Sequence, residues 1–246
     1  MTVTVTIADV VVSPIAVVPP VYASINHNLP TDADFFVVQF FRSINQPEKV
    51  IVVRDTLRFL IDGIDTSASY KLLAFKISNG IADGVWWVDD YVYDVDQVNI
   101  VFKSSAENSQ TGDPKSYSGT ILVADLPAIR TVVAVALDAD TPYLLASTQS
   151  DSNGAYTLDW NGYTGQMLIT VHDDYGVAHV SGEARGVGER IHPAVYTGYV
   201  YDVTITGTLG LEPTWPTEAG QTVLSGSCQL IAVPFYKPQT QGPYFV

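Results

Sequence analysis

The chain has 246 residues, of which 47% are hydrophobic and only 15% are charged. Low charge combined with high apolar content excludes a mostly disordered chain. The formal net charge of −14 argues against general binding to nucleic acid and to acidic membrane surfaces, because a strongly anionic protein repels both.

Neither a disulfide nor a membrane span is expected. The single cysteine, Cys228, cannot form an internal disulfide or a cysteine-based zinc cluster. No stretch approaches the roughly 18–20 uninterrupted apolar residues of a transmembrane helix. Residues 1–7 alternate in polarity and carry no basic side chain, so they predict a strand and not a signal peptide.

Short runs rich in Val, Ile, Tyr, Phe and Thr recur along the whole chain and predict strands, because such side chains suit a pleated, half-buried surface. In chain order they are residues 35–41, 50–53, 57–61, 70–77, 98–102, 131–137, 155–159, 166–172, 199–206 and 227–233. The turn dipeptides between them are Asn79-Gly80, Asp83-Gly84, Asn153-Gly154, Asn161-Gly162 and Tyr175-Gly176. The sequence therefore predicts an all-β protein of two or three small antiparallel β-sandwich modules in tandem.

Two polar or glycine-rich stretches suggest domain boundaries. Residues 104–118 are polar and nearly free of aliphatic side chains, which is typical of a linker or a long exposed loop. Residues 181–188 contain three glycines and form a softer boundary. We therefore expect an N-terminal β domain over residues 1–115, a second β-sandwich over 118–182 and a small β module over 186–246.

The histidines and acidic residues give little support for a metal or a cofactor. His172 and His179, with Asp173 and Asp174 close by, are compatible with a metal site, but a strand that ends in a turn explains them more simply. The segment Asp151-Ser-Asn-Gly154, like residues 138–140, lacks the ligand spacing of a calcium loop, and we expect hairpin turns there. We expect neither a metal nor a cofactor.

Catalytic motifs are equally weak. The chain has no Gly-x-Ser-x-Gly elbow and no Gly-rich phosphate-binding loop. Cys228 lies in an apolar strand, where a thiol is normally inert packing. Paired carboxylates such as Asp89-Asp90 leave a glycoside hydrolase open on residue types alone, but an acidic β protein supplies such pairs by chance. We expect a protein that is not an enzyme.

An aromatic cluster is the better functional candidate. Trp86, Trp87, Tyr91 and Tyr93 lie beside several aspartates. Adjacent residues on a strand point to opposite faces, so the two indoles cannot both enter one core. Either one of them faces solvent, a partner or a sugar, or one lies in a core and the other is covered by a loop of the same subunit.

Aromatic side chains are also concentrated at the C-terminus, in residues 235–246. Four of them would favour burial: Phe235, Tyr236, Tyr244 and Phe245. The prolines and the glycine in this segment should prevent a regular strand. We therefore interpret it as an arm that docks on a neighbouring subunit.

A tight turn is expected around Trp215, because Pro213 and Pro216 restrict the backbone on both sides of it. The indole either plugs a small core, with Tyr199 or Tyr201 packed on it, or contacts a ligand. Arg190 and His192 should form a cationic edge in an otherwise acidic half of the chain.

Two resemblances cover residues 118–233. Residues 130–138, 144–158 and 163–171, including the turn Ser-Asp-Ser-Asn-Gly-Ala-Tyr, resemble the carboxypeptidase regulatory-like, transthyretin-type β-sandwich. A second set resembles a short module that recurs in tailed-bacteriophage structural proteins: residues 188–193, 198–203, 207–210, 212–217 and 220–226.

The first half of the chain resembles a small β domain of phage tail and fibre proteins. Residues 25–29, 36–40 and 98–102 carry this similarity, with much more chain inserted between the second and third pieces. None of these families implies catalytic residues that could be carried over.

The resemblances imply a non-enzymatic structural protein of a tailed-phage virion. It would assemble with identical subunits and with other phage structural proteins at the tail, the neck or the fibre attachment. One alternative is a carbohydrate-binding module for host attachment, with Trp86, Trp87 and Tyr91 as its platform for a surface glycan. Another is a capsid decoration protein.

Overall fold

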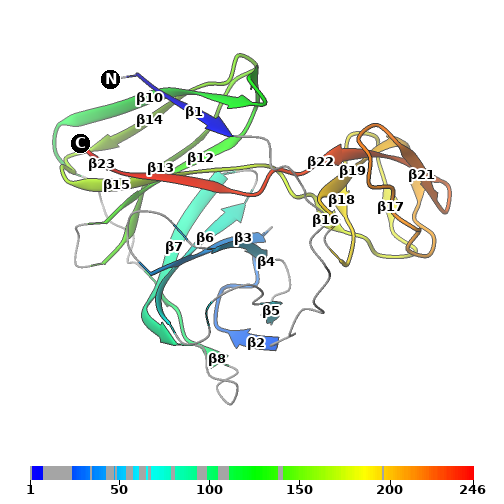
Figure 1. Cartoon of the computed structure of the whole chain (residues 1–246), viewed down its shortest axis with the longest axis horizontal. Coiled ribbons are helices and arrows are strands. Elements are labelled where there is room, and N and C mark those ends of the chain that lie inside the picture. Colours follow the sequence, from blue (N-terminus) through cyan, green and yellow to red (C-terminus); the bar gives the residue numbers. More distant parts are fainter. Residues whose placement is uncertain are drawn as a thin grey trace. The chain divides into compact units, whose positions relative to one another are not determined.

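A computed structural model describes residues 2–7, 24–33, 35–42, 47, 49–53, 58–60, 65, 68–78, 81–92, 99–104, 111–137, 141–195 and 197–246. Every regular element in these residues is a β-strand (Figure 1), which confirms the predicted all-β class. A helix able to cross a membrane is absent from this described part of the chain. Contacts group the chain into two compact units. Unit 1 is Met1–His172 with Lys237–Val246, and unit 2 is Asp173–Tyr236.

Unit 1 contains four sheets, numbered here in the order in which they stack (Figure 1). Sheet I contains β1 (Thr2–Ile7), β10 (Pro114–Val123), β11 (Leu126–Pro127) and β14 (Ala155–Asn161). Sheet II has the order β13 (Tyr143–Gln149), β12 (Thr131–Ala136), β15 (Gln166–His172), β23 (Gln239–Phe245). Sheet III has the order β4 (Lys49–Val53), β3 (Phe35–Phe41), β6 (Ser69–Ser78), β7 (Ile81–Val92), β9 (Lys103–Ser104). Sheet IV has the order β5 (Arg58–Leu60), β2 (Ser24–His27), β8 (Asn99–Ile100).

The middle sheets are buried on both faces, which explains the continuous apolar runs in their strands. All seven residues of β3 and all six of β12 are buried. One core lies between sheets II and III, where Val37 and Phe75 meet Val133 and Leu168. Strands covered on both sides lose the alternation of polar and apolar residues seen in strands with one solvated face.

The core between sheets III and IV joins the three separated stretches that resemble a small phage β domain. Leu29, Phe36, Phe40, Ile100 and Phe102 all belong to it. Strand β2 pairs in parallel with β8, and the Asn28 side chain bonds both the amide and the carbonyl of Phe102. The chain inserted between the second and third stretches therefore does not separate them in space.

Sheets I and II form a sandwich that takes a strand from each end of the chain. β1 pairs in parallel with β10, and β23 pairs antiparallel with β15 (Figure 1). The expectation that proline and glycine keep residues 235–246 out of a strand is wrong, because Gln239–Phe245 pairs with β15 around a register shift. This segment docks on its own chain in the structure.

Three local predictions from the sequence also differ from the structure. The expected linker at 104–118 overlaps β10, which begins at Pro114, because its polar residues occupy exposed positions of a strand covered on one face. Asp83-Gly84 lies within β7, and is not a turn. Asp151 caps a turn through its Oδ1, which accepts the amides of Asn153 and Ala155 at 2.8 and 2.9 Å, but this turn joins strands of two different sheets. Residues 138–140 lie outside the described residues.

Unit 2 is built on one five-stranded sheet. Its order is β16 (Val177–Ala178), β18 (Arg190–His192), β19 (Tyr199–Ile205), β22 (Cys228–Pro234), β21 (Thr222–Ser225). A separate short pair joins β17 (Ala184–Arg185) and β20 (Gly207–Thr208). The core on one face of the main sheet includes Ile191, Tyr201, Cys228 and Leu230.

Unit 2 is an insertion in the connection between two paired strands of unit 1. Val171 in β15 is the register partner of Gln239 in β23, and the chain of unit 2 runs between these two positions. The two compact units therefore differ from the three segments expected from the sequence. Residues 1–172 lie in one unit, and residues 237–246 belong to the same unit. The glycine-rich stretch 181–188 lies inside unit 2.

Candidate functional site

The aromatic cluster of β7 is divided between two cores. Trp87 is 5% exposed and packs between sheets II and III. Trp86 is half-buried on the opposite face, where its ring meets that of Phe36 edge-on at 5.6 Å. Tyr91 is buried on the same face as Trp86. The three rings therefore form no shared exposed platform for a sugar, and each packs against its own chain. Tyr93 lies outside the described residues.

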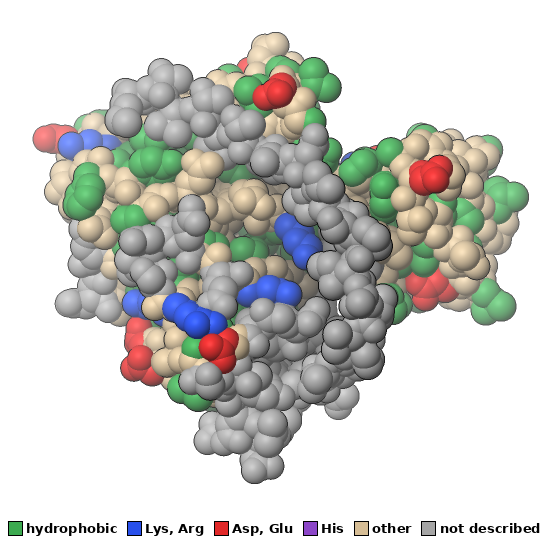
Figure 2. Space-filling view, viewed as in Figure 1, with side chains coloured by type: hydrophobic (Ala, Val, Ile, Leu, Met, Phe, Trp, Pro, Cys, Tyr) green, Lys and Arg blue, Asp and Glu red, His purple; other side chains and the backbone are tan. Residues whose placement is uncertain are grey.

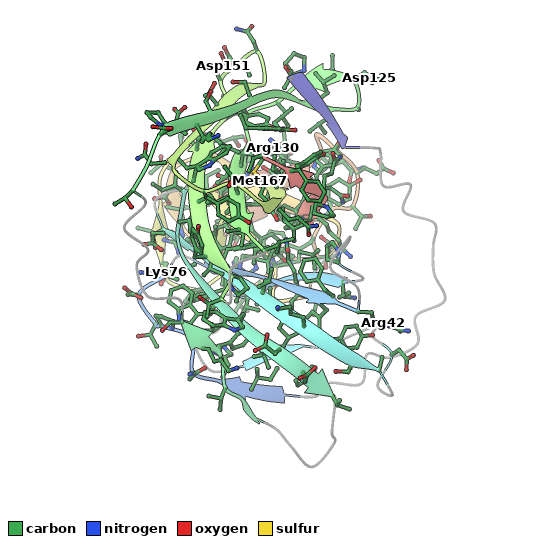
Figure 3. The ribbon with its side chains drawn as sticks, turned by 90° about the vertical axis from the view of Figure 1, so that its left-hand side faces the viewer. Arg42, Lys76, Asp125, Arg130, Asp151 and Met167 are labelled. Carbon is green, nitrogen blue, oxygen red and sulfur yellow. The ribbon has the colours of Figure 1, made fainter. Side chains whose placement is uncertain are left out.

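The carboxylate beside this cluster is held by lysines. Asp89 lies 2.9 Å from the Lys103 ammonium and 3.4 Å from that of Lys71. The hydrogen bond from Lys103 is the main reason that the pKa of Asp89 lies below its usual value. A carboxyl group kept ionised in this way is poorly suited to act as a general acid. Lys76 is paired similarly, with Asp32 and Asp83, and Figure 3 shows it on the side of the ribbon away from Arg42.

The histidines are used in packing. His172 is buried, and its ring meets Phe35 edge-on at 5.6 Å. The His179 ring contacts Trp215 edge-on, and its Nε2 lies 2.9 Å from Ser225 Oγ. Among the described residues no group of three or more His, Cys, Asp or Glu is placed to hold a metal ion.

The His179–Ser225 contact is a structural clamp that sequence reasoning missed. Ser225 is 1% exposed, and its hydroxyl also accepts the amide of Gly210 at 3.2 Å. A nucleophilic serine must be accessible to its substrate, whereas this hydroxyl ties a strand end to the neighbouring loop. No local pattern marks the pair, because 46 positions separate the two residues.

Arg190 does not form the expected cationic edge. Its guanidinium makes two bonds to the Asp202 carboxylate, at 2.7 and 3.0 Å, and a third to Asp173 at 3.2 Å. Asp173 is buried, so the cluster carries its own counter-charges. His192 stacks on Tyr175 with ring centroids 4.3 Å apart. Both side chains are therefore packed within unit 2, and the charge of Arg190 is paired.

Trp215 closes the core of unit 2. Its ring lies on Tyr201, with centroids 4.3 Å apart, and its Nε1 donates to Glu212 Oε1 at 2.8 Å. Glu212 Oε1 also accepts the amide of Ala194 at 2.9 Å. These hydrogen bonds, that from Ala194 first, hold the pKa of Glu212 below its ordinary value. The geometry matches the interpretation of Trp215 as a core plug resting on Tyr201.

The aromatic residues of the C-terminal segment are divided between the two units. Phe235 is buried in unit 2 beside Tyr175, and Tyr236 is half-buried at the end of that unit. In unit 1, Tyr244 packs near Tyr117 with ring centroids 5.7 Å apart. Phe245 is 77% exposed, the largest exposed fraction in this group.

Among the residues that the structure describes, exposed aliphatic side chains are more frequent on unit 2 than on unit 1. Figure 2 shows hydrophobic and acidic side chains interspersed on its visible face. The large apolar side chains exposed there are Val177, Val180, Val187, Val195, Ile205, Leu211 and Leu224. Leu211 is 86% exposed and Leu224 is 66% exposed, the latter on the edge strand β21. The alternation of polar and apolar residues in β21 indicates that one of its side chains points outward. The sequence alone did not show which apolar residues of unit 2 remain exposed.

Unit 1 has a shallow hollow of about 300 Å³ between β4 and the start of the returning C-terminal segment. Lys49, Lys237 and Thr240 are among its lining residues. The Thr240 hydroxyl is already bonded to the buried Gln39 and Thr170 side chains.

Comparisons of the chain with protein-family models, with curated proteins and with solved structures find no match.

Proposed function

We propose that this protein is a structural component of a tailed-bacteriophage virion. It assembles with identical copies and with other phage structural proteins at the tail, the neck or the fibre attachment. The resemblance of residues 188–226 to a recurrent phage module, and of residues 130–171 to a transthyretin-type sandwich, supports this role.

The observation that carries the proposal is the set of exposed aliphatic side chains on unit 2. Single exposed apolar residues are normal on protein surfaces, but this 64-residue unit displays seven. Seven acidic and two basic residues also give it a net charge of −5. Aliphatic side chains rimmed by charged ones are typical of protein–protein interfaces.

The topology of unit 2 suits an attachment role. Both of its connections to unit 1 leave from neighbouring positions on paired strands, β15 and β23. A unit inserted in this way adds a binding surface without changing the pairing within the sandwich. We therefore assign the contact with other virion proteins to unit 2.

The copy number in purified virions, combined with native mass spectrometry of the isolated protein, tests this proposal. We expect an oligomer, and a copy number that corresponds to a ring or a fibre. The large number of copies found on a capsid shell would favour the decoration alternative. A stable monomer that is absent from purified virions would overturn the proposal.

A pair of substitutions locates the interface. Leu211→Asp with Leu224→Asp should abolish the assembly, because both charges would be desolvated on binding. Val101→Asp is the matched control: Val101 is 71% exposed in unit 1, so this variant should assemble normally. Unimpaired assembly of the double variant would show that these residues lie outside the interface.

A further inference from the structure

The N-terminal strand β1 is joined to its sheet by pairing that no local turn imposes. All six of its residues pair in parallel with β10, from Thr2 opposite Ser118 to Ile7 opposite Val123. Parallel strands cannot be connected by a tight hairpin, and more than a hundred residues separate these two. β1 can therefore pair with any β10 strand that it can reach, whether in its own chain or in another copy.

The connection after β1 is longer than the stack of sheets that it crosses. β1 belongs to sheet I and the next described strand, β2, belongs to sheet IV, at opposite ends of the stack (Figure 1). Three spacings between stacked sheets amount to about 30 Å. The sixteen residues 8–23 can span up to about 55 Å when extended. The extended length of the connection therefore exceeds the height of the stack.

The edge that β1 covers has none of the usual protection against pairing between molecules. Neither residues 2–7 nor residues 118–123 include a charged side chain or a proline. The register places Val3, Val5 and Ile7 opposite the alternate residues 119, 121 and 123 of β10, all of which are buried. Natural edge strands normally avoid pairing between chains by carrying charges or proline. The β1 of another copy would fit this edge as well as the chain's own.

The strand β23 is held by both side-chain and backbone hydrogen bonds. The Thr240 hydroxyl of β23 receives a hydrogen bond from Gln39 Nε2 at 2.5 Å and lies 2.9 Å from that of Thr170. The last residue, Val246, exchanges two backbone hydrogen bonds with Gly165. A strand tied by buried side-chain bonds to two sheets is a poor candidate for exchange.

We propose that β1 is exchanged between copies of this chain in the assembled protein, with β1 of one copy pairing in parallel with residues 118–123 of the next. The same hydrogen bonds form within or between chains, and the high local concentration in an assembly lets the β1 of a neighbouring copy compete with the chain's own. This inference rests on the proposed function only in requiring neighbouring copies.

A disulfide between register partners tests the exchange. Val5→Cys and Ile121→Cys are introduced together in a Cys228→Ala background, and the assembled protein is oxidised and analysed by non-reducing electrophoresis. We expect most chains to migrate as covalent dimers or longer species. An oligomer by native mass spectrometry whose disulfides all lie within single chains would overturn the exchange and leave the proposed function standing. A monomer under all conditions would overturn both.

A mixing experiment keeps the test valid if the double variant folds poorly. Chains with Val5→Cys alone and chains with Ile121→Cys alone, both with Cys228→Ala, are co-assembled and oxidised. Only an exchanged strand can join the two types through this pair. Replacing Ile121→Cys by Thr157→Cys gives the matched control, because Thr157 lies in β14 on the other side of β10. We expect heterodimers with the first pair and none with the control; equal yields would refute the exchange.

Discussion

The two units of this protein build their cores in different ways. Unit 1 stacks four sheets, so strands such as β3 and β12 are buried on both faces. Unit 2 buries one face of a single sheet and closes it with the loop that carries Trp215. Ion pairs occur in both units, but among the described residues the pair with a nearly fully buried carboxylate, Arg190–Asp173, lies in unit 2. The predictions below test this difference.

The largest effect is expected from Trp87→Ala. Removing an indole packed between two sheets leaves a cavity and should lower the free energy of unfolding of unit 1 by about 3–5 kcal/mol. Denaturant titration, with hydrogen exchange resolved for each unit, measures the loss. Trp86→Ala is the control, since this side chain is only half-buried; equal losses for the two variants would contradict the assignment of their faces.

Arg190→Gln should destabilise unit 2 by about 3 kcal/mol, because it leaves the buried Asp173 without its counter-charge. Arg185→Gln breaks the pair with Glu183, whose carboxylate is 45% exposed, and should cost less than about 1 kcal/mol. Thermal unfolding of both variants provides the comparison. Equal effects would show that the Arg190 cluster is no more important than a surface ion pair.

Tyr156→Phe should stabilise unit 1 by about 1 kcal/mol, because the buried Tyr156 hydroxyl has no hydrogen-bond partner among the described residues. Burial also raises the pKa of Tyr156, and that of Tyr117 to about 12. Stability should therefore fall as the pH rises above about 10, where the unfolded phenols ionise first. The variant should show a weaker fall in alkaline urea titrations. Tyr244→Phe is the contrasting case, because its hydroxyl donates to Gln241.

The smallest effect is expected for the stability that the Glu212 carboxylate contributes, which depends on pH. Its lowered folded pKa means that the carboxylate stabilises unit 2 above the ordinary glutamate value, and that this contribution is lost as the pH falls through the folded value. Glu212→Gln should therefore melt below the native protein at pH 7, and the difference should be smaller at pH 3. Calorimetry at both pH values measures this; a constant difference would contradict a role for the charge.

Local pattern was sufficient to predict several strands, but not β10 or β23. Residues 35–41 and 166–172 were predicted with the observed limits, because strand formation depends on neighbouring side chains and on β-branched and aromatic content. The opposite directions of Trp86 and Trp87 also follow from the two-residue period of a strand. The sequence could not show that both rings would be covered by their own chain.

Pairing partners were decided by the tertiary structure alone. Nothing in residues 2–7 or 239–245 marks β10 or β15 as the neighbouring strand, and nothing in residues 173–236 marks them as an insertion. The charge of Arg190 was visible in the sequence, but its neutralisation by Asp202 and Asp173 was not. A strand's conformation is determined by adjacent residues, whereas its neighbours, and therefore its exposed surface, depend on contacts between residues that are distant in the chain.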